Sequence, residues 1–334
     1  MHTQNESSKS RMWLLRRWFR RVKEMVLCGR GMPHDGMTSP TASTFNFYTK
    51  EDLVIGRDWV FVRTHDGRMR FVCGKAEENF IHEVCSWRNV VCAAAGFHEA
   101  FAVLSTGVVV GASSREKGMG IMYWRHMKSV VACEGRVAGV THDNAIVSRS
   151  DQSGYEKPED YDRQLEQRFS GGDVKRLAVG WLHAAVLDVS GRVSVVGEGK
   201  YCGAGDVLEW RDVVDIDVFG CYYSPIQTVG LRSDGRVLHT LKCPEIDSWC
   251  DVVSISCLGS DAVAALTADG HVLLAGNRAD HHREAVKGWP PMAAVRGNFD
   301  TLAGISRDGD VWVFDGRRQY CLRRNAAASV VLAK

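Results

Sequence analysis

The sequence lacks the features that mark membrane-spanning proteins, disulfide-bonded secreted proteins and the common zinc-binding proteins. No stretch approaches the roughly 18 uninterrupted apolar residues of a spanning helix, and the first residues lack the apolar core of a secretory signal. The 11 cysteines include no C-x-x-C pair, which removes support for zinc ribbons and thioredoxin-like chemistry. Their odd number and their dispersion indicate a reducing compartment, so we predict a cytoplasmic protein.

Signatures of catalysis are missing too. The sequence contains no G-x-S-x-G, no H-E-x-x-H and no G-x-x-x-x-G-K-[ST]. A polar cluster at residues 271–284 holds three histidines, and we interpret it as a solvated loop. His98 and His183 follow corresponding strands, which favours structural hydrogen bonds over proton transfer. We therefore predict that the protein is not an enzyme and uses no cofactor and no metal.

Proline is scarce, with 7 residues, whereas glycine, with 33, is abundant, a balance that favours many tight turns. A turn dipeptide followed by a short apolar strand recurs about every 40 residues. The seven copies stand at residues 66–67, 106–107, 143–144, 190–191, 234–235, 269–270 and 308–309. Six end in glycine, and the third ends in Asn144. The chain from residue 51 onward is thus an array of seven similar units.

Each unit reads as a short apolar strand, a second strand, an Asp-Gly type turn suited to a tight hairpin, and a third strand. A tryptophan then precedes the next unit, and we expect these rings to pack neighbouring units together. They are Trp87, Trp124, Trp210, Trp249 and Trp289. Small sheets with two apolar faces are stable when stacked radially, so we predict an all-β, seven-bladed β-propeller. The first unit lacks a leading Val-Val strand, and we expect Val330, Val331 and Leu332 to complete the ring beside it.

The recurring W-x-x-V-V, glycine, apolar strand and x-D-G-x-V resemble the repeats of the regulator-of-chromosome-condensation superfamily. The short period is most similar to a branch common in bacterial proteins, which includes a propeller-type inhibitor of β-lactamases. Residues 178–206 match best, with Gly180, His183 and Gly191 at family positions. The resemblance covers residues 51–334 and implies a seven-bladed propeller. Members of the superfamily act as guanine-nucleotide exchange factors, chromatin binders, ligase accessory domains and enzyme inhibitors, nearly all by presenting a face to a partner.

In a propeller, the loops that follow the leading strand of each blade share one face of the ring. These loops carry aromatic residues, which are typical of protein-binding hot spots. The candidate partner-binding residues are Trp59, Phe97, Trp181, Tyr222, Tyr223 and Phe299. The alternative is that these rings fill gaps between the blades near the central channel.

A polar insertion at residues 148–173 lengthens the connection between the third and fourth units. Long loops on rigid scaffolds are frequent partner contacts, so Asp160 and Tyr161 are further candidates. The competing interpretation is a solvated excursion that forms a helix. A loop of this kind could also open a nucleotide-binding protein, which makes a guanine-nucleotide-exchange-type regulator of a small GTPase our alternative function.

The N-terminal region has a different character from the rest. Residues 1–10 are expected to be disordered, residues 11–28 to form an amphipathic basic helix, and residues 29–50 to be a linker. The helix has an excess of arginines, and it could bind an anionic membrane surface or an acidic partner. The candidate residues are Arg16, Arg17, Trp18, Arg20 and Arg21. Nucleic-acid docking, organelle targeting and packing against the propeller are alternatives for residues 11–27.

The region after residue 26 holds 35 basic and 38 acidic side chains, a net charge of −3, which argues against nucleic-acid binding by the body. The sequence as a whole predicts a non-enzymatic protein–protein interaction module. Its rigid propeller would present aromatic residues of one loop face to a protein partner, and its basic helix could place it at the membrane periphery.

Overall fold

The computed structural model describes residues 48–114, 124–150, 158–169, 172–181, 183–197, 204–220, 227–277, 279–324 and 331–332. They form seven antiparallel sheets that follow one another along the chain. The predicted tail, the predicted helix 11–28 and residues 29–47 lie outside the described residues. The prediction of an all-β, seven-bladed propeller is confirmed.

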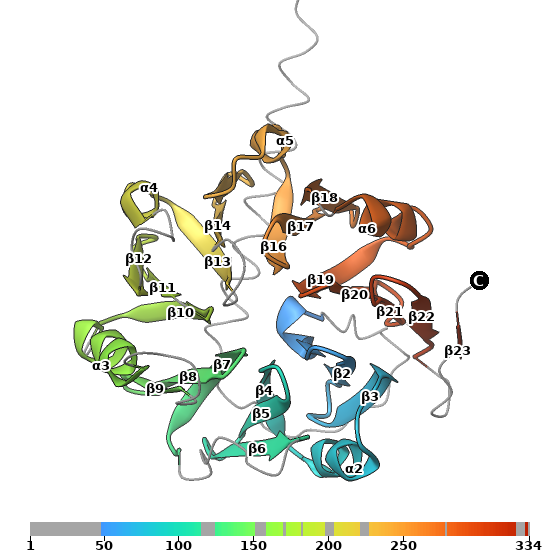
Figure 1. Cartoon of the computed structure of the whole chain (residues 1–334), viewed down its shortest axis with the longest axis horizontal. Helices are drawn as coiled ribbons and strands as arrows, with labels where there is room; N and C mark the ends of the chain where they lie inside the picture. The colour runs from blue at the N-terminus through green and yellow to red at the C-terminus, as the bar shows by residue number, and fades with distance from the viewer. Residues whose placement is uncertain are drawn as a thin grey trace, which may run out of the picture. The chain divides into compact units, whose positions relative to one another are not determined.

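Blades 1 to 4 each contain three strands, and in each the first strand lies innermost (Figure 1). Blade 1 is β1 (Leu53–Ile55), β2 (Trp59–Arg63) and β3 (Met69–Gly74); blade 2 is β4 (Val90–Ala95), β5 (Glu99–Leu104) and β6 (Val109–Ser113); blade 3 is β7 (Met127–Cys133), β8 (Arg136–Thr141) and β9 (Ile146–Ser150); blade 4 is β10 (Val174–Val179), β11 (His183–Asp188) and β12 (Val193–Gly197).

Blades 5 and 6 repeat this plan, and blade 7 has two additional strands. Blade 5 is β13 (Val213–Phe219), β14 (Gln227–Arg232) and β15 (Val237–His239); blade 6 is β16 (Val252–Leu258), β17 (Ala262–Thr267) and β18 (Val272–Gly276); blade 7 is β19 (Met292–Asn298), β20 (Thr301–Ser306), β21 (Val311–Phe314), β22 (Gln319–Leu322) and β23 (Val331–Leu332).

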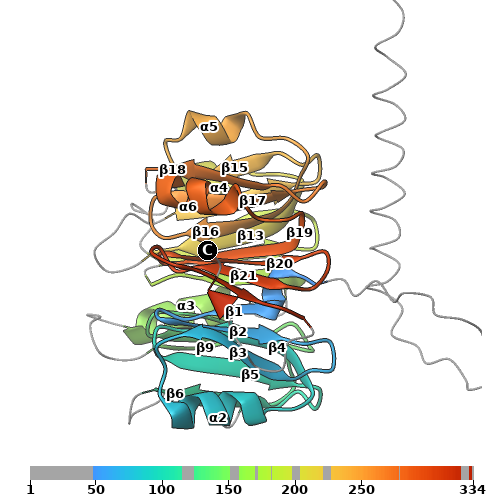
Figure 2. The ribbon, with the colours of Figure 1, turned by 90° about the vertical axis from the view of Figure 1, so that its right-hand side faces the viewer.

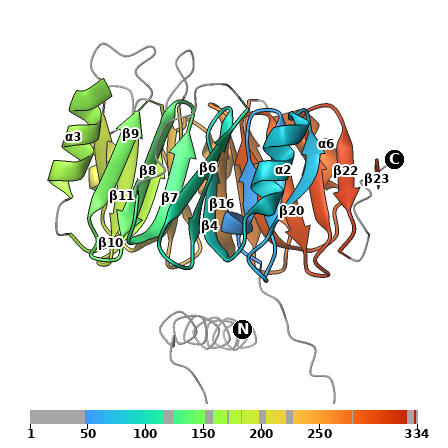
Figure 3. The same cartoon turned by 90° about the horizontal axis from the view of Figure 1, so that it is seen from below.

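Short helices follow the third strands of five blades and lie on the outer rim of the ring (Figure 1, Figure 3). Helices α2 and α5 lie on opposite sides of the ring (Figure 2). The helices are α2 (Glu78–Ser86), α3 (Pro158–Arg168), α4 (Ala204–Leu208), α5 (Pro244–Asp247) and α6 (Ala279–Val286). No helix of the described residues is long and apolar enough to span a membrane.

The turn dipeptides behave as the sequence predicts. Their glycines have positive φ angles, and Asn144 adopts the same conformation with a φ of 65°, which asparagine tolerates better than most residues. At five of the seven joints, the carbonyl of the turn glycine accepts a hydrogen bond of 2.9–3.1 Å from the first amide of the next blade's inner strand, as from Val90 to Gly67. The turns therefore connect blade to blade as well as strand to strand.

The joint between blades 3 and 4, at the turn that ends in Asn144, is made differently, and the Val174 amide donates to the Gly172 carbonyl. Lys128 donates hydrogen bonds from Nζ to Asn144 Oδ1 and, at 3.3 Å, to the Val174 carbonyl. A lysine side chain thus connects the third turn to the inner strand of blade 4. At five other joints, the carbonyl of the turn glycine makes the corresponding connection.

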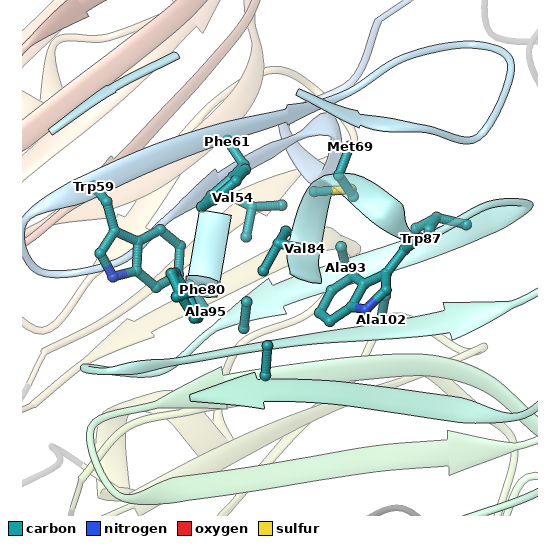
Figure 4. Packing of buried hydrophobic residues seen from close by; sticks show 13 residues of the cluster. Val54, Trp59, Phe61, Met69, Phe80, Val84, Trp87, Ala93, Ala95 and Ala102 are labelled. Atoms are coloured by element: carbon teal, nitrogen blue, oxygen red, sulfur yellow. The ribbon is translucent and has the colours of Figure 1, made fainter. Parts of the chain in front are cut away.

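The tryptophans before the blades pack between neighbours, as predicted. Trp87 lies among buried residues of blades 1 and 2, near Met69 of blade 1 and Ala93 of blade 2 (Figure 4). The middle strand of a blade has a glycine where such a ring lies. A β-carbon at Gly230 would be 2.9 Å from the Trp210 ring, and one at Gly304 would be 2.9 Å from the Trp289 ring. Glycine is required at these two positions because the ring occupies the space of a side chain.

The joint between blades 7 and 1 corrects the predicted closure. Strand β23 pairs with β22, through Cys321 opposite Val331, at the outer edge of blade 7 and not with blade 1. Strand β1 already occupies the innermost position of blade 1, so no strand is missing there. The two blades meet through buried side chains on both sides, among them Leu53, Ile55, Ala303 and Ile305.

Side chains of β19 reinforce this joint, which we call the seam. Arg296 donates from Nη1 to the Leu53 carbonyl at 3.0 Å, and Asn298 donates from Nδ2 to the Ile55 carbonyl at 2.7 Å. The ring therefore closes by packing and side-chain hydrogen bonds across two complete sheets.

The ring-on-glycine packing predicts the effect of adding a methyl group under Trp210. Gly230→Ala should lower the free energy of unfolding by about 1–3 kcal/mol, because the new β-carbon overpacks the joint between blades 4 and 5. Gly288→Ala is the matched control, since a β-carbon added there would have no atom within 4 Å. Urea denaturation of both variants measures the difference. Equal stabilities of the two variants would contradict the packing described for Trp210.

Candidate functional site: the loop face and the central channel

The inner strands of all seven blades run in the same direction, so the loops that follow them gather on one face of the ring. We call this face the loop face; its described loops are residues 56–58, 96–98, 134–135, 180–181, 259–261 and 299–300. The Asp-Gly turns gather on the opposite face, which we call the turn face. This arrangement places candidates that are far apart in the sequence on a common surface.

Three phenylalanines from different blades meet at the centre of the loop face. The Phe97 and Phe299 rings contact edge to face with centroids 5.0 Å apart, and Phe219 lies 5.5 Å from Phe299 in the same geometry. The exposed Arg57 places its guanidinium carbon 4.4 Å from the Phe97 centroid. We call these four residues the aromatic cluster. Phe97 and Phe299 remain partly exposed, whereas Phe219 is buried.

A carboxylate on the blade 3 loop adds to this surface. Burial raises the pKa of Glu134, and the positive charge of Arg57 acts in the opposite direction. Residues of blades 1, 2, 3, 5 and 7 thus contribute to one central region of the loop face.

Among the predicted aromatic candidates of the loop face, Trp59 does not lie on the surface. Trp59 is 4% exposed and packs against Phe61 and Phe80 inside the joint between blades 1 and 2. As the first residue of β2, its side chain turns into the core and not toward the loop face. Trp181 lies on the loop face and is partly buried, and its amide donates to the Gly220 carbonyl at 2.9 Å. Tyr222 and Tyr223 lie outside the described residues.

The insertion contains the predicted helical excursion, α3, but this helix is firmly docked on blade 3. Asp162 accepts hydrogen bonds from the Ser150 amide (2.8 Å) and from the hydroxyls of Ser148 (2.6 Å) and Ser150 (2.9 Å). Leu165 is fully buried. Tyr161 is 7% exposed, with the Arg136 guanidinium carbon 3.3 Å from its ring centroid. Tyr161 therefore packs beneath α3 and offers little surface to a partner, and nothing is described of the Asp160 side chain.

The segment before blade 1 forms a one-turn 3-10 helix, η1 (Lys50–Asp52), which packs against β4 and β19. Lys50 reaches across the channel and bonds from Nζ to Asp215 Oδ2 of blade 5 (2.6 Å) and to the Ile255 carbonyl of blade 6 (2.7 Å). Arg176 of blade 4 pairs with the other oxygen of Asp215 at 2.6 Å and also with Glu51. We call Lys50, Glu51, Arg176 and Asp215 the channel network.

Lys50 and Asp215 are the most buried members of the channel network, and their pKa values reflect this. Burial lowers the pKa of Lys50, and Asp215 acts in the opposite direction. Burial would raise the pKa of Asp215, but Arg176 and Lys50 outweigh it and hold that pKa below its usual range. The network therefore connects the segment before blade 1 to blades 4, 5 and 6 by charge-assisted hydrogen bonds.

A buried histidine and two cysteines have structural roles. His183 is completely buried, and its Nε2 lies 3.2 Å from Thr228 Oγ1 of the next blade. Burial, assisted by the charge of Arg136, lowers the pKa of His183 to about 3. Burial also raises the pKa of Cys92 and Cys257, and a protonated thiol is a poor nucleophile.

Sequence reasoning missed the channel network, Arg57 and Phe219. Lys50 is the last residue of the predicted linker and Glu51 the first residue of the repeat array, and Asp215 is one of two acids inside an otherwise apolar strand. Those acids were the available signal, because a buried carboxylate needs a partner. Phe219 is the last residue of its strand, and Tyr222 and Tyr223 follow it in the sequence.

The buried histidine makes a prediction about pH. In the unfolded chain histidine titrates near pH 6.5, so between that value and the folded pKa of about 3 the unfolded state binds the proton first. Through His183, the free energy of unfolding should therefore decrease by about 1.4 kcal/mol per pH unit as the pH falls from 6 to 4.5. His183→Gln should remove this part of the slope. His82→Gln, at a side chain that is 76% exposed, should leave the slope unchanged. Urea denaturation across this pH range tests it, and an unchanged slope in His183→Gln would contradict the assignment.

The channel network makes a separate prediction. Asp215→Asn should lower the free energy of unfolding by about 3 kcal/mol, because Lys50 and Arg176 would lose their shared buried carboxylate. Glu284→Gln breaks the exposed pair with Lys287 and should cost less than about 0.5 kcal/mol. Denaturant titrations of both variants at neutral pH provide the comparison. Similar small losses in both would show that the channel network does not stabilise the ring.

No protein-family model and no curated protein matches the sequence. Solved structures with the same fold do match. Yeast RCC1 (Prp20) has a TM-score of 0.54 at 12% identity, with 85% of this chain and 86% of that chain covered. The ectodomain of the Arabidopsis thaliana receptor kinase ACR4 has a TM-score of 0.55 at 10% identity, covering 85% and 98%. That of the Physcomitrella patens receptor kinase CR4 has a TM-score of 0.54 at 10% identity, covering 81% and 73%. These likenesses show a shared β-propeller fold.

Proposed function

We propose that the propeller is a non-enzymatic protein-interaction module that binds its partner with the centre of the loop face. The observation that carries this proposal is the convergence of Phe97, Phe219, Phe299 and Arg57 from four different blades. Phe97 and Phe299 keep part of their surface accessible while their packing fixes their orientation. Partly buried aromatic and arginine side chains near the centre of a surface are characteristic binding anchors.

The loops that carry the aromatic cluster are short and held by backbone hydrogen bonds. The amide of Gly96 donates to the Glu99 carbonyl at 2.8 Å, on either side of Phe97, and the amide of Gly56 donates to the Trp59 carbonyl at 3.0 Å, on either side of Arg57. Loops ordered before binding lose little conformational entropy when a partner docks. A few anchors could therefore give useful affinity.

The structural comparisons support a protein partner by analogy. A crystal structure of Prp20p from Saccharomyces cerevisiae is described together with its binding to Gsp1p and histones, and yeast RCC1 (Prp20) has been solved bound to Kap60. We propose that the present chain belongs to the same regulator-of-chromosome-condensation superfamily, in its short-period branch. The repeated x-D-G-x-V turns and the tryptophan packing support this placement.

The alternative function is a guanine-nucleotide-exchange-type regulator of a small GTPase. In that function, the 148–173 segment would insert into the GTPase and open its nucleotide-binding site. Helix α3 is held to blade 3 by Asp162 and by Glu166, which accepts from the Ser148 amide at 2.8 Å. A docked helix is suited to stabilising the blade, so we rank this function second. A nucleotide-release assay separates the two functions, because only an exchange factor accelerates release.

The basic segment at residues 11–28 remains a proposed second contact. Its arginines would bind an anionic membrane surface or an acidic protein and would place a cytoplasmic propeller at the membrane periphery.

The loop-face proposal predicts which variant loses its partner. Phe97→Ala combined with Phe299→Ala should weaken capture of the physiological partner at least tenfold, because two anchors near the centre of the surface are lost. Val189→Ser removes an apolar side chain that is 64% exposed on the turn face and serves as the control. Affinity capture with quantitative mass spectrometry compares the variants after circular dichroism has shown that each is folded. A partner retained equally by the double variant and the control would contradict a loop-face site.

A further inference from the structure

A cavity of about 190 Å³ lies in the central channel and is lined by the inner strands and η1. Its walls combine small or apolar residues with charged ones. The cations of the lining are Lys50, Lys175, Arg176 and Arg296. Its carboxylates are Glu51 and Asp217, and Asp215 forms ion pairs with Lys50 and Arg176. The four cations of the lining, its two carboxylates and the paired Asp215 together carry a formal charge of +1.

The carboxylates are committed to partners other than Arg296. Asp215 binds Lys50 and Arg176, and Glu51 binds Arg176. Asp217 accepts hydrogen bonds at Oδ2 from Ser256 Oγ (3.0 Å) and from the Cys257 amide (2.9 Å). Lys175 and Arg296 are thus the cations of the lining that form no ion pair among the described residues, and the charge of Asp217 offsets one of the two.

Arg296 has unused hydrogen-bonding capacity. A guanidinium carries five N–H donors. In the part of the chain that the structure describes, Arg296 donates one hydrogen bond, to the Leu53 carbonyl, and forms no ion pair. Burial lowers its pKa, with the attraction of Asp217 acting in the opposite direction. Arg296 is partly exposed and lines the cavity, so an anion there would accept hydrogen bonds from its unused donors.

We infer that the channel cavity binds a small organic monoanion, with its carboxylate held by the free edge of the Arg296 guanidinium. The planar fork of arginine matches the two oxygens of a carboxylate. A single negative charge balances the formal charge of the lining and Asp215 together, whereas phosphate is more than singly charged at neutral pH. The volume accommodates several water molecules or one small acid of the size of lactate. Lys175 is exposed and lines the cavity, which places an entrance beside it.

This site is separate from the aromatic cluster and does not depend on the proposed function. The probes are acetate, L-lactate and inorganic phosphate, titrated into the full-length chain by isothermal titration calorimetry at constant ionic strength set with sodium chloride. We expect saturable binding of one carboxylate per chain, with lactate or acetate favoured over phosphate. Arg296→Met should weaken binding at least about tenfold through loss of the charge-assisted hydrogen bonds. Arg68→Met, at a guanidinium that is 59% exposed on the turn face, is the control and should bind as the natural chain does.

A second variant tests the cavity without changing the seam. Ala132→Leu adds bulk to the lining from β7 and leaves the bond between Arg296 and Leu53 in place. It should also weaken carboxylate binding at least tenfold, and it decides the outcome if Arg296→Met does not fold. Absence of saturable carboxylate binding, tighter binding of phosphate, or undiminished binding in Ala132→Leu would each overturn the inference.

Discussion

Each blade is a small sheet with two apolar faces, and such a sheet is stable only when both faces are covered. In an open row the two end blades would each leave one face in water, so the array must close on itself. Every other feature of the ring serves this requirement. The tryptophans, the glycines beneath them and the bonds from turn glycines to neighbouring inner strands all set the spacing and angle between successive blades.

Closure at the seam depends on different interactions. Strands β1 and β19 belong to separate sheets, and their contact consists of buried apolar residues together with bonds from Arg296 and Asn298. The channel network adds a connection through the centre, because Lys50 reaches blades 5 and 6 from the segment just before blade 1. One consequence is functional. A ring held at its rim and through its channel keeps the aromatic cluster, whose members come from four blades, in a fixed arrangement.

The repeat made most of the fold predictable. Seven turn dipeptides determined the blade count, and tryptophans at one repeated position indicated the packing between blades. The closure was mispredicted because the short strand β1 does not resemble the Val-Val strands, although it fills the same position. The site was predicted only in part: Phe97 and Phe299 do meet, but Trp59 is the first residue of a strand and points inward, and Tyr161 is covered by Arg136. Pairings across the channel, such as Lys50 with Asp215, join residues far apart in the sequence and leave no periodic trace.

A closed ring requires that the seam hold as firmly as the joints made by turn glycines. Native-state hydrogen exchange on the full-length chain tests this directly, by comparing amides of β2 and β20 beside the seam with those of β14 and β17. We expect all four strands to exchange only through global unfolding, with one common free energy and one common dependence on denaturant. Earlier exchange of β2 and β20, while β14 and β17 stay protected, would show that the ring opens at the seam and would contradict a uniformly stable ring.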